Sequence, residues 1–398
     1  MKTFSFDAQV TAALFDRTGA VFALGDGAVV FDSGERAEAH DGAVLCACVH
    51  PSGDGVVTGG DDGKLVWSRR GESVLLATAK GQWIDAVDAA PDTGLIAFAF
   101  GKTLSVIDAA DAAFRRDFVH ERTVSGVAFE PKGRRVAAST YGGAALWYAR
   151  IAQQQPTVLK WAGSHTGVGW SPDGVFLITT MQDNQLHGWR LKDQRNMRMG
   201  GYPAKIRNMA FLAKGRLLAT PGAQGVVLWP FEGSNGPMGR EATEIGFDET
   251  SLVNLVAAQP KHGRVAAGLN DGRVWVADPS AQGLERVKAD KGAPIVALAL
   301  DAAAQRLAWA DEDGQAGIGL GLGSKGVCSL AKTQRRPPRP SHVRPRRTQT
   351  SAKVRRNVIG GWDESRLDRL HRLAFFVVRG LEGPTFWAKG SVLRPASP

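Results

Sequence analysis

The sequence contains few cysteines and no long hydrophobic run, and both shortages exclude classes of protein. Three cysteines in 398 residues cannot form the dense disulfide framework of a small secreted protein. The first ten residues, MKTFSFDAQV, lack the basic head and unbroken apolar stretch of a secretory signal. Apolar runs are interrupted by Gly, Asp or Lys within about ten residues, whereas a membrane-spanning helix needs roughly 20. We therefore expect a soluble protein of the reducing cytoplasm.

Excess positive charge is absent from most of the chain, although the formal net charge is +10. Residues 319–398 contain 17 Lys and Arg against 4 Asp and Glu, which leaves 32 basic and 35 acidic residues for residues 1–318. The composition changes at the same place, from short apolar runs separated by Gly to the Pro/Arg-rich segment QRRPPRPSHVRPRRTQTSAKVRR. We predict a folded region over 1–318 and a separate basic tail.

Residues 1–318 contain a repeated unit with a period near 40 residues. The clearest copies are VSGVAFEPKGRRVAASTYGGAALW, VGWSPDGVFLITTMQDNQLHGW and AVLCACVHPSGDGVVTGGDDGKLVW. Each has an apolar strand, a turn with Gly, a second strand, a turn rich in Gly, Asp or Asn, and a third strand that ends in Trp. With weaker copies, units 1 to 8 span 10–31, 43–67, 83–108, 124–147, 168–189, 206–229, 252–276 and 295–318.

The apolar runs in these units are five to eight residues long and rich in Val, Phe, Ala and Leu, which indicates strands rather than helices. A single unit cannot bury both faces of its sheet, whereas units stacked around an axis bury both faces of each. We therefore predict an all-β fold, a β-propeller of about eight, alternatively seven, four-stranded antiparallel blades. Residues 3–6, TFSF, are expected to supply the outer strand of the last blade, and the strand-end Trp residues to pack between blades.

The repeat resembles the WD40 family, whose period is about 40–45 residues. The resemblance covers residues 1–318 and rests on SPDG at 171–174, EPKG at 130–133 and the Gly/Asp turn before a strand ending in Trp. No unit ends in the Trp-Asp pair of the family, and the Gly-His dipeptide is reduced to lone His40, His120 and His165. These departures predict a weakened version of the family's internal His/Asp hydrogen-bond network.

The resemblance implies a non-enzymatic scaffold that binds a protein or peptide on the narrower face of the disk. Loops before each inner strand and turns between the second and third strands build that face. The residues of this sequence expected there are His40, Trp83, His120, Arg122, Tyr141, Gln182, Tyr202, Lys205 and Asn270. Three of them are Trp or Tyr, the type enriched at binding hot spots. The partner and the oligomeric state are unknown, and no cofactor is expected.

Cys46, Cys48 and His50 alternate along one predicted strand and so share a face. Thiolates and imidazoles are zinc ligands, which makes a metal-dependent propeller enzyme the third hypothesis for function. Same-face neighbours lie about 6.6 Å apart along a strand, a long spacing for ligands of one ion, so core packing is the preferred interpretation. The sequence contains neither a nucleophile elbow nor an H-E-x-x-H motif, and no catalytic residue is predicted.

Three interpretations of the basic tail stay open. Residues 319–362 are typical of a disordered polybasic linker or tail, which would bind nucleic acid or another anionic surface by counterion release; this is the second hypothesis for function. Residues 363–398 begin with DESRLDRLHRLAFFVVRGL, which predicts a short amphipathic helix. The third interpretation is that the tail is an out-of-frame translation, because Arg, Pro, Gly and Ser enrichment is expected from a shifted frame of a GC-rich bacterial gene.

Overall fold

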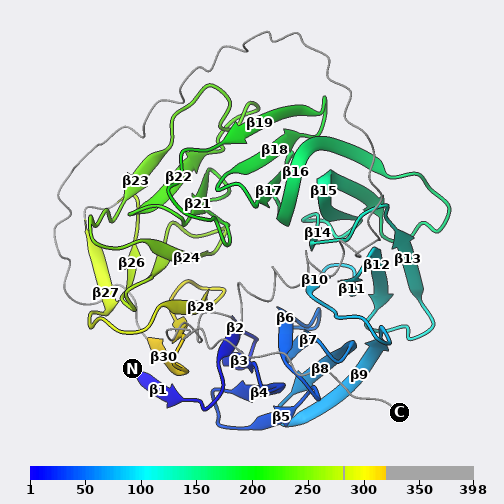
Figure 1. The fold of residues 1–398 in the computed structure, drawn as a ribbon, viewed down its shortest axis with the longest axis horizontal. Helices are drawn as coiled ribbons and strands as arrows, with labels where there is room; N and C mark the ends of the chain where they lie inside the picture. Colours follow the sequence, from blue (N-terminus) through cyan, green and yellow to red (C-terminus); the bar gives the residue numbers. More distant parts are fainter. Residues whose placement is uncertain (281–282, 320–398) are drawn as a thin grey trace, which may run out of the picture. The chain divides into compact units, whose positions relative to one another are not determined.

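The computed structural model describes residues 1–280 and 283–319, and every regular element in them is a β-strand (Figure 1). The prediction of an all-β fold is therefore confirmed. No helix long and apolar enough to cross a membrane occurs in these residues. Residues 320–398 lie outside the described residues, and with them lie the basic linker predicted up to residue 362 and the helix predicted in 363–398.

Six sheets contain four antiparallel strands each. The first three in chain order are β2 (Val10–Phe15), β3 (Ala20–Leu24), β4 (Ala28–Phe31) and β5 (Arg36–Glu38); β6 (Val44–Val49), β7 (Val56–Gly60), β8 (Lys64–Arg69) and β9 (Glu72–Thr78); and β10 (Ala86–Ala90), β11 (Leu95–Phe100), β12 (Thr103–Asp108) and β13 (Arg115–Val119). Two more are β20 (Ala210–Leu212), β21 (Leu217–Thr220), β22 (Val226–Pro230) and β23 (Thr243–Ile245); and β24 (Val253–Ala258), β25 (Val265–Leu269), β26 (Val274–Ala277) and β27 (Leu284–Lys288). The last four-stranded sheet is β1 (Lys2–Ser5), β30 (Gln315–Gly319), β29 (Leu307–Asp311) and β28 (Ile295–Leu300).

Units 4 and 5 share one six-stranded sheet. It comprises β14 (Gly126–Phe129), β15 (Arg135–Tyr148), β16 (Thr157–Trp170), β17 (Phe176–Met181), β18 (Leu186–Arg190) and β19 (Arg195–Met199). The first part of β16 pairs with β15, as in Leu146↔Thr157, and its last part pairs with β17, as in Trp170↔Leu177. The eight sequence units therefore form seven hydrogen-bonded sheets around the ring (Figure 1), which agrees with the predicted propeller and with seven as its alternative number.

The N-terminal strand closes the ring as predicted. β1 pairs antiparallel with β30, with Phe4 opposite Ala316. The ring of Phe4 also lies 5.4 Å from that of Phe22 on β3, between centroids. The first strand thus completes the last sheet and packs against the first one, so the two ends of the described ring hold each other.

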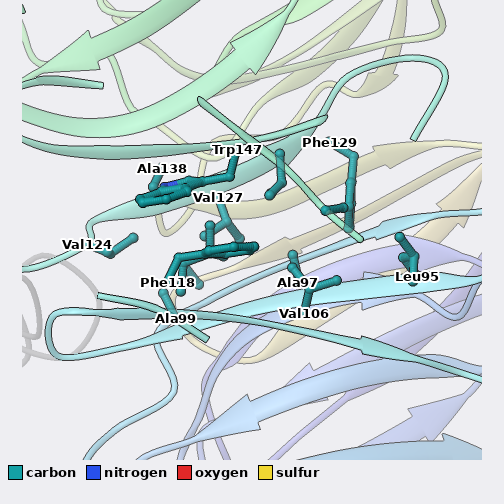
Figure 2. Close-up of a cluster of buried hydrophobic side chains, with 14 of the residues drawn as sticks. Leu95, Ala97, Ala99, Val106, Phe118, Val124, Val127, Phe129, Ala138 and Trp147 are labelled. Atoms are coloured by element: carbon teal, nitrogen blue, oxygen red, sulfur yellow. The ribbon is translucent and has the colours of Figure 1, made fainter. Parts of the chain in front are cut away.

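The core lies between neighbouring sheets, and the boundary between β10–β13 and β14–β15 is typical (Figure 2). Trp147, at the end of the third strand of unit 4, stacks on Phe118 of β13 with ring centroids 4.7 Å apart. Both side chains are buried. The prediction that strand-end Trp residues pack between blades is confirmed at this boundary, because Phe118 belongs to the preceding sheet.

Side chains also clamp the inner strands to one another. An inner strand has one unpaired edge, whose backbone groups need partners. Asp88 of β10 accepts the Phe129 N–H of β14 at 2.7 Å. The amide of Asn208 donates to the Val256 carbonyl at 2.7 Å and accepts the Val256 N–H at 3.2 Å. These bonds join consecutive sheets at the centre and stiffen the loops that follow the inner strands.

Candidate functional site

The loops predicted to bind a partner are held by backbone hydrogen bonds. We call them the candidate face: the loops before the inner strands and the turns between second and third strands. Between units 2 and 3, Ala79 N donates to Gly63 O at 2.7 Å and Ile84 N donates to Gly60 O at 3.1 Å. Gly63 has a φ of 75°, and a Cβ there would lie 2.5 Å from the Ala79 oxygen. The Gly/Asp turn therefore exists because only glycine lets the next loop pack against it.

His40 belongs to an internal network beneath this face. Its Nδ1 lies 3.0 Å from Asp62 Oδ1 and its Nε2 lies 2.8 Å from Thr58 Oγ1. Burial disfavours the Asp62 carboxylate, but hydrogen bonds from the Lys64 N–H and His40 outweigh it and lower the pKa of the carboxyl. The His/Asp network is thus complete in unit 2, contrary to the expected weakening. Because the His40 side chain is fully buried, it cannot touch a partner.

Tyr202 occupies a similar internal position. Its hydroxyl lies 2.6 Å from Thr220 Oγ1 and accepts the indole N–H of Trp229 at 2.6 Å. Burial raises the pKa of Tyr202 to about 12, so the hydroxyl stays protonated. Like His40, this predicted contact residue is buried, so its side chain is not part of the binding surface.

His120 supports the loop that carries Arg122. Its Nε2 accepts the indole N–H of Trp147 at 3.1 Å, and its backbone N donates to Lys102 O at 2.9 Å. Burial lowers the pKa of the His120 imidazole, which keeps the ring neutral as an acceptor. Arg122, two residues later, is exposed. The half-buried ring therefore fixes the position from which the guanidinium reaches solvent.

The remaining predicted residues lie at the surface of the candidate face. Tyr141 is 59% exposed, and Trp83 is half-buried. Lys205 Nζ donates to Gln182 Oε1 at 2.9 Å, so these two side chains meet as neighbours. Asn270 is exposed, but its Oδ1 accepts the Leu252 N–H at 2.8 Å and so holds its own loop.

Cys46, Cys48 and His50 do not converge. Cys46 Sγ lies 3.3 Å from Ile84 O of the next unit, and both cysteines are free thiols that pack at the boundary between β7–β8 and β11. The His50 ring instead stacks on Trp67, with centroids 4.0 Å apart. Within residues 1–280 and 283–319, no group of three His, Cys, Asp or Glu side chains is arranged to hold a metal ion. The geometry favours the packing interpretation.

Charge divides the candidate face into two sectors. The loops of units 3 to 6, together with Lys160 of β16, contain six Lys and Arg against three Asp and Glu; these are Lys80, Lys102, Arg122, Lys160, Lys205 and Arg207 against Asp85, Glu121 and Asp183. The loops of units 7, 8, 1 and 2, together with the first residue of β8 and the last residue of β29, contain three basic and twelve acidic residues; these are Lys64, Arg273 and Lys291 against Asp7, Asp26, Asp41, Asp61, Asp62, Asp248, Glu249, Asp271, Asp290, Asp311, Glu312 and Asp313. We call the first the basic sector and the second the acidic sector.

Asp88 is a residue that the sequence analysis missed. It lines a shallow hollow of about 260 Å³ on the opposite face, together with Asp92 and Glu130. Burial raises the pKa of Asp88 to about 6. The signal was present, because Asp88 interrupts the apolar strand AVDAA. Since its carboxylate already accepts the Phe129 N–H, the geometry assigns it to the inter-sheet clamp.

Comparison with known proteins agrees with this architecture. Residues 35–67 match the family model "WD domain, G-beta repeat", and this segment contains the complete His40 network. No curated protein sequence matches the chain.

Two solved structures share the fold. The β-propeller domain of Cps50 (Swd1) from Myceliophteria thermophila is 15% identical with a TM-score of 0.55, over 70% of this chain and 96% of that one. A chain of a mitotic checkpoint complex is also 15% identical with a TM-score of 0.55, over 80% of this chain and 93% of that one. One segment of the chain thus matches a WD40 repeat, and the described chain shares the β-propeller fold of these two structures.

Proposed function

We propose that the protein is a non-enzymatic scaffold that binds a protein or peptide on the basic sector of the candidate face. The observation that carries the proposal is Tyr141, an aromatic side chain that is 59% exposed. It lies on β15, beside the irregularity in pairing between Tyr141 and Gly143, and its backbone is paired with Ser164. Ser164 O in turn accepts the Gln182 N–H at 3.0 Å. A rigid exposed aromatic is the kind of anchor that dominates binding energy.

Trp83 supports the proposal from the adjacent loops. Its ring is half-buried, and its indole N–H has no hydrogen-bond partner among the described residues, so it is available to a ligand. Loops held by backbone bonds lose little conformational entropy on binding. One similar chain belongs to a mitotic checkpoint complex, which is an assembly of the kind proposed for this protein. The free thiols of Cys46 and Cys48 fit the expected cytoplasmic compartment.

A photo-crosslinking experiment tests the proposal with a matched control. Tyr141 and Tyr148 are 59% and 53% exposed, and they lie at opposite ends of the third strand of unit 4. A photoreactive phenylalanine analogue replaces either residue in the full chain, expressed in its host cells. We expect a partner to be crosslinked from position 141 and not from position 148. The reverse pattern would assign binding to the other face and refute the proposal.

Affinity gives a second measurement once a partner is crosslinked. Tyr141→Ala is expected to weaken its binding by tenfold or more, about 1.4 kcal/mol or above. Tyr148→Ala should leave the affinity within about twofold. Equal losses for both variants would mean that neither side chain is a specific anchor.

A further inference from the structure

The basic sector carries positive charges that the fold itself does not use. Lys80, Lys102, Arg122 and Lys160 are exposed, and none forms an ion pair with a described residue. Elsewhere on the same face, a cation is paired within the protein: Arg273 forms ion pairs with Asp248 and Asp271, each at an N···O distance of 2.7 Å. Unpaired exposed cations cost little in folding, but they attract a ligand of opposite charge.

The positions of these cations follow from the loop contacts. Lys102 and the loop of Arg122 are joined, because His120 N donates to Lys102 O at 2.9 Å and Val124 N donates to Gly101 O at 2.9 Å. The loops that carry Lys102 and Arg122 are therefore tied together. Tyr141 lies on β15, the strand that follows the inner strand after Arg122, at the irregularity in pairing between Tyr141 and Gly143. Ser125 N, three residues after Arg122, also donates to Ser139 O of β15, the strand that carries Tyr141, at 2.8 Å.

We propose that the basic sector binds an acidic peptide segment that also carries an aromatic or aliphatic anchor; this inference rests on the proposed function. The guanidinium of Arg122 presents a planar fork that matches a carboxylate, and Lys102 adds a second charge beside it. Tyr141 and Trp83 supply apolar surface with a polar end for the anchor. Recognition thus combines charge with one or two ring contacts.

The acidic sector determines orientation. It holds twelve acidic residues against three basic ones, so it repels an acidic segment and confines it to the loops of units 3 to 6. Like-charge contact of this kind suppresses wrong placements. The same argument disfavours nucleic acid on this face, because a long polyanion needs a continuous positive track, and residues 1–318 carry 32 basic and 35 acidic residues.

Selection from a displayed library of random peptides of about 12 residues tests the inference on the full chain. Lys102→Glu/Arg122→Glu is the test variant, and Lys192→Glu/Arg195→Glu is the control. The control makes the same change of charge at two exposed residues of the opposite face, Lys192 in the turn before β19 and Arg195 at the start of β19. All three proteins carry the same basic tail, so peptide bound by the tail cancels in the comparison.

We expect the enriched peptides to be rich in Asp and Glu with at least one aromatic or large aliphatic residue. Fluorescence anisotropy with one such labelled peptide should give affinities that agree within about twofold for the wild type and the control. The test variant should bind about tenfold or more weakly, and the wild-type affinity should fall as salt rises.

Three results would overturn the inference, and they separate it from the proposed function. Peptides that lose binding in Tyr141→Ala but are not acidic, and that ignore the charge reversal, would leave the proposed function standing and refute the acidic ligand. Selection that depends on neither change would refute both. Single-stranded DNA that competes for the site, and itself depends on Lys102 and Arg122, would replace the peptide with nucleic acid.

Discussion

Asp88 offers a direct measurement of how burial affects this ring. It lies on the inner strand β10, and its Oδ2 accepts the Phe129 N–H at 2.7 Å across the boundary between two sheets. Burial raises its pKa from 3.8 to about 6, although hydrogen bonds from the Phe129 and Ala89 backbone N–H groups favour the charged form. Above that pH, the ionised carboxylate of Asp88 therefore lowers the free energy of unfolding.

The sign of the pH dependence follows from the two pKa values. The folded state binds the proton more tightly than the unfolded chain, so the stabilisation is complete below about pH 3.8 and is lost as the pH rises through about 6. The difference of about 2.2 pKa units corresponds to about 3 kcal/mol. Asp88→Asn removes the charge, while its amide oxygen can still accept the Phe129 N–H. We expect the variant to be up to about 3 kcal/mol more stable than the wild type at about pH 8, and nearly equal at about pH 4.

Urea unfolding of the wild type and the variant at both pH values is the assay, because the difference between the two proteins cancels the titration of all other groups. Asp92→Asn is the control: Asp92 is exposed and lines the same hollow, and exposed substitutions usually change stability by less than about 0.5 kcal/mol. A variant that is destabilised equally at both pH values would refute the reasoning. It would show that the carboxylate is needed for the inter-sheet hydrogen bond and that burying its charge does not destabilise the folded protein.

Three further predictions concern other parts of the ring. His187 is buried and stacks on Trp161 with ring centroids 4.0 Å apart, and burial lowers the pKa of its imidazole from 6.5 to about 3. The folded state is therefore destabilised relative to the unfolded chain as the pH falls below 6.5. In urea unfolding at a series of pH values, His187→Phe should remove up to about 5 kcal/mol of this loss of stability in acid. Phe4→Ala should cost about 2 kcal/mol in thermal unfolding, because the half-buried ring packs on Phe22 and holds the closing strand. Burial raises the pKa of the Cys46 and Cys48 thiols, so both should react with Ellman's reagent about 100-fold more slowly in the native protein than in urea.

Each of these predictions has a simple contradiction. If His187→Phe lost as much stability as the wild type on acidification, the imidazole would be protonated in the folded state. Thr3→Ala, at an exposed position of the same strand, is the control for Phe4→Ala, and equal losses would indicate that the strand is held by its backbone alone. Thiol reactivity is measured in Cys328→Ser, since residue 328 lies outside the described residues; rapid native labelling would show that the boundary beside β7 opens readily.

The units, their strands and the closing strand were predictable from the sequence because their signals are local. Apolar runs of five to eight residues predict strands. Glycine at the turns predicts hairpins, as Gly63 shows with its positive φ. Even the pairing of β1 with β30 could be inferred, because the composition changes to the basic tail after unit 8 and leaves residues 3–6 to supply its outer strand. The surface positions of Arg122 and Tyr141 followed from the same repeat.

Tertiary structure alone decided which of the predicted face residues are buried. Tyr202 and Lys205 are three residues apart in one loop, yet Tyr202 is covered because Thr220 and Trp229, from later strands, bond its hydroxyl. The two ring nitrogens of His40 are likewise hydrogen-bonded to Asp62 and Thr58. Burial and the pKa of a group such as Asp88 depend on the neighbouring sheet, which is about 40 residues away in the chain, one repeat period. A local pattern therefore specifies that a loop exists and which residues it holds, whereas packing between units decides which side chains remain free to bind.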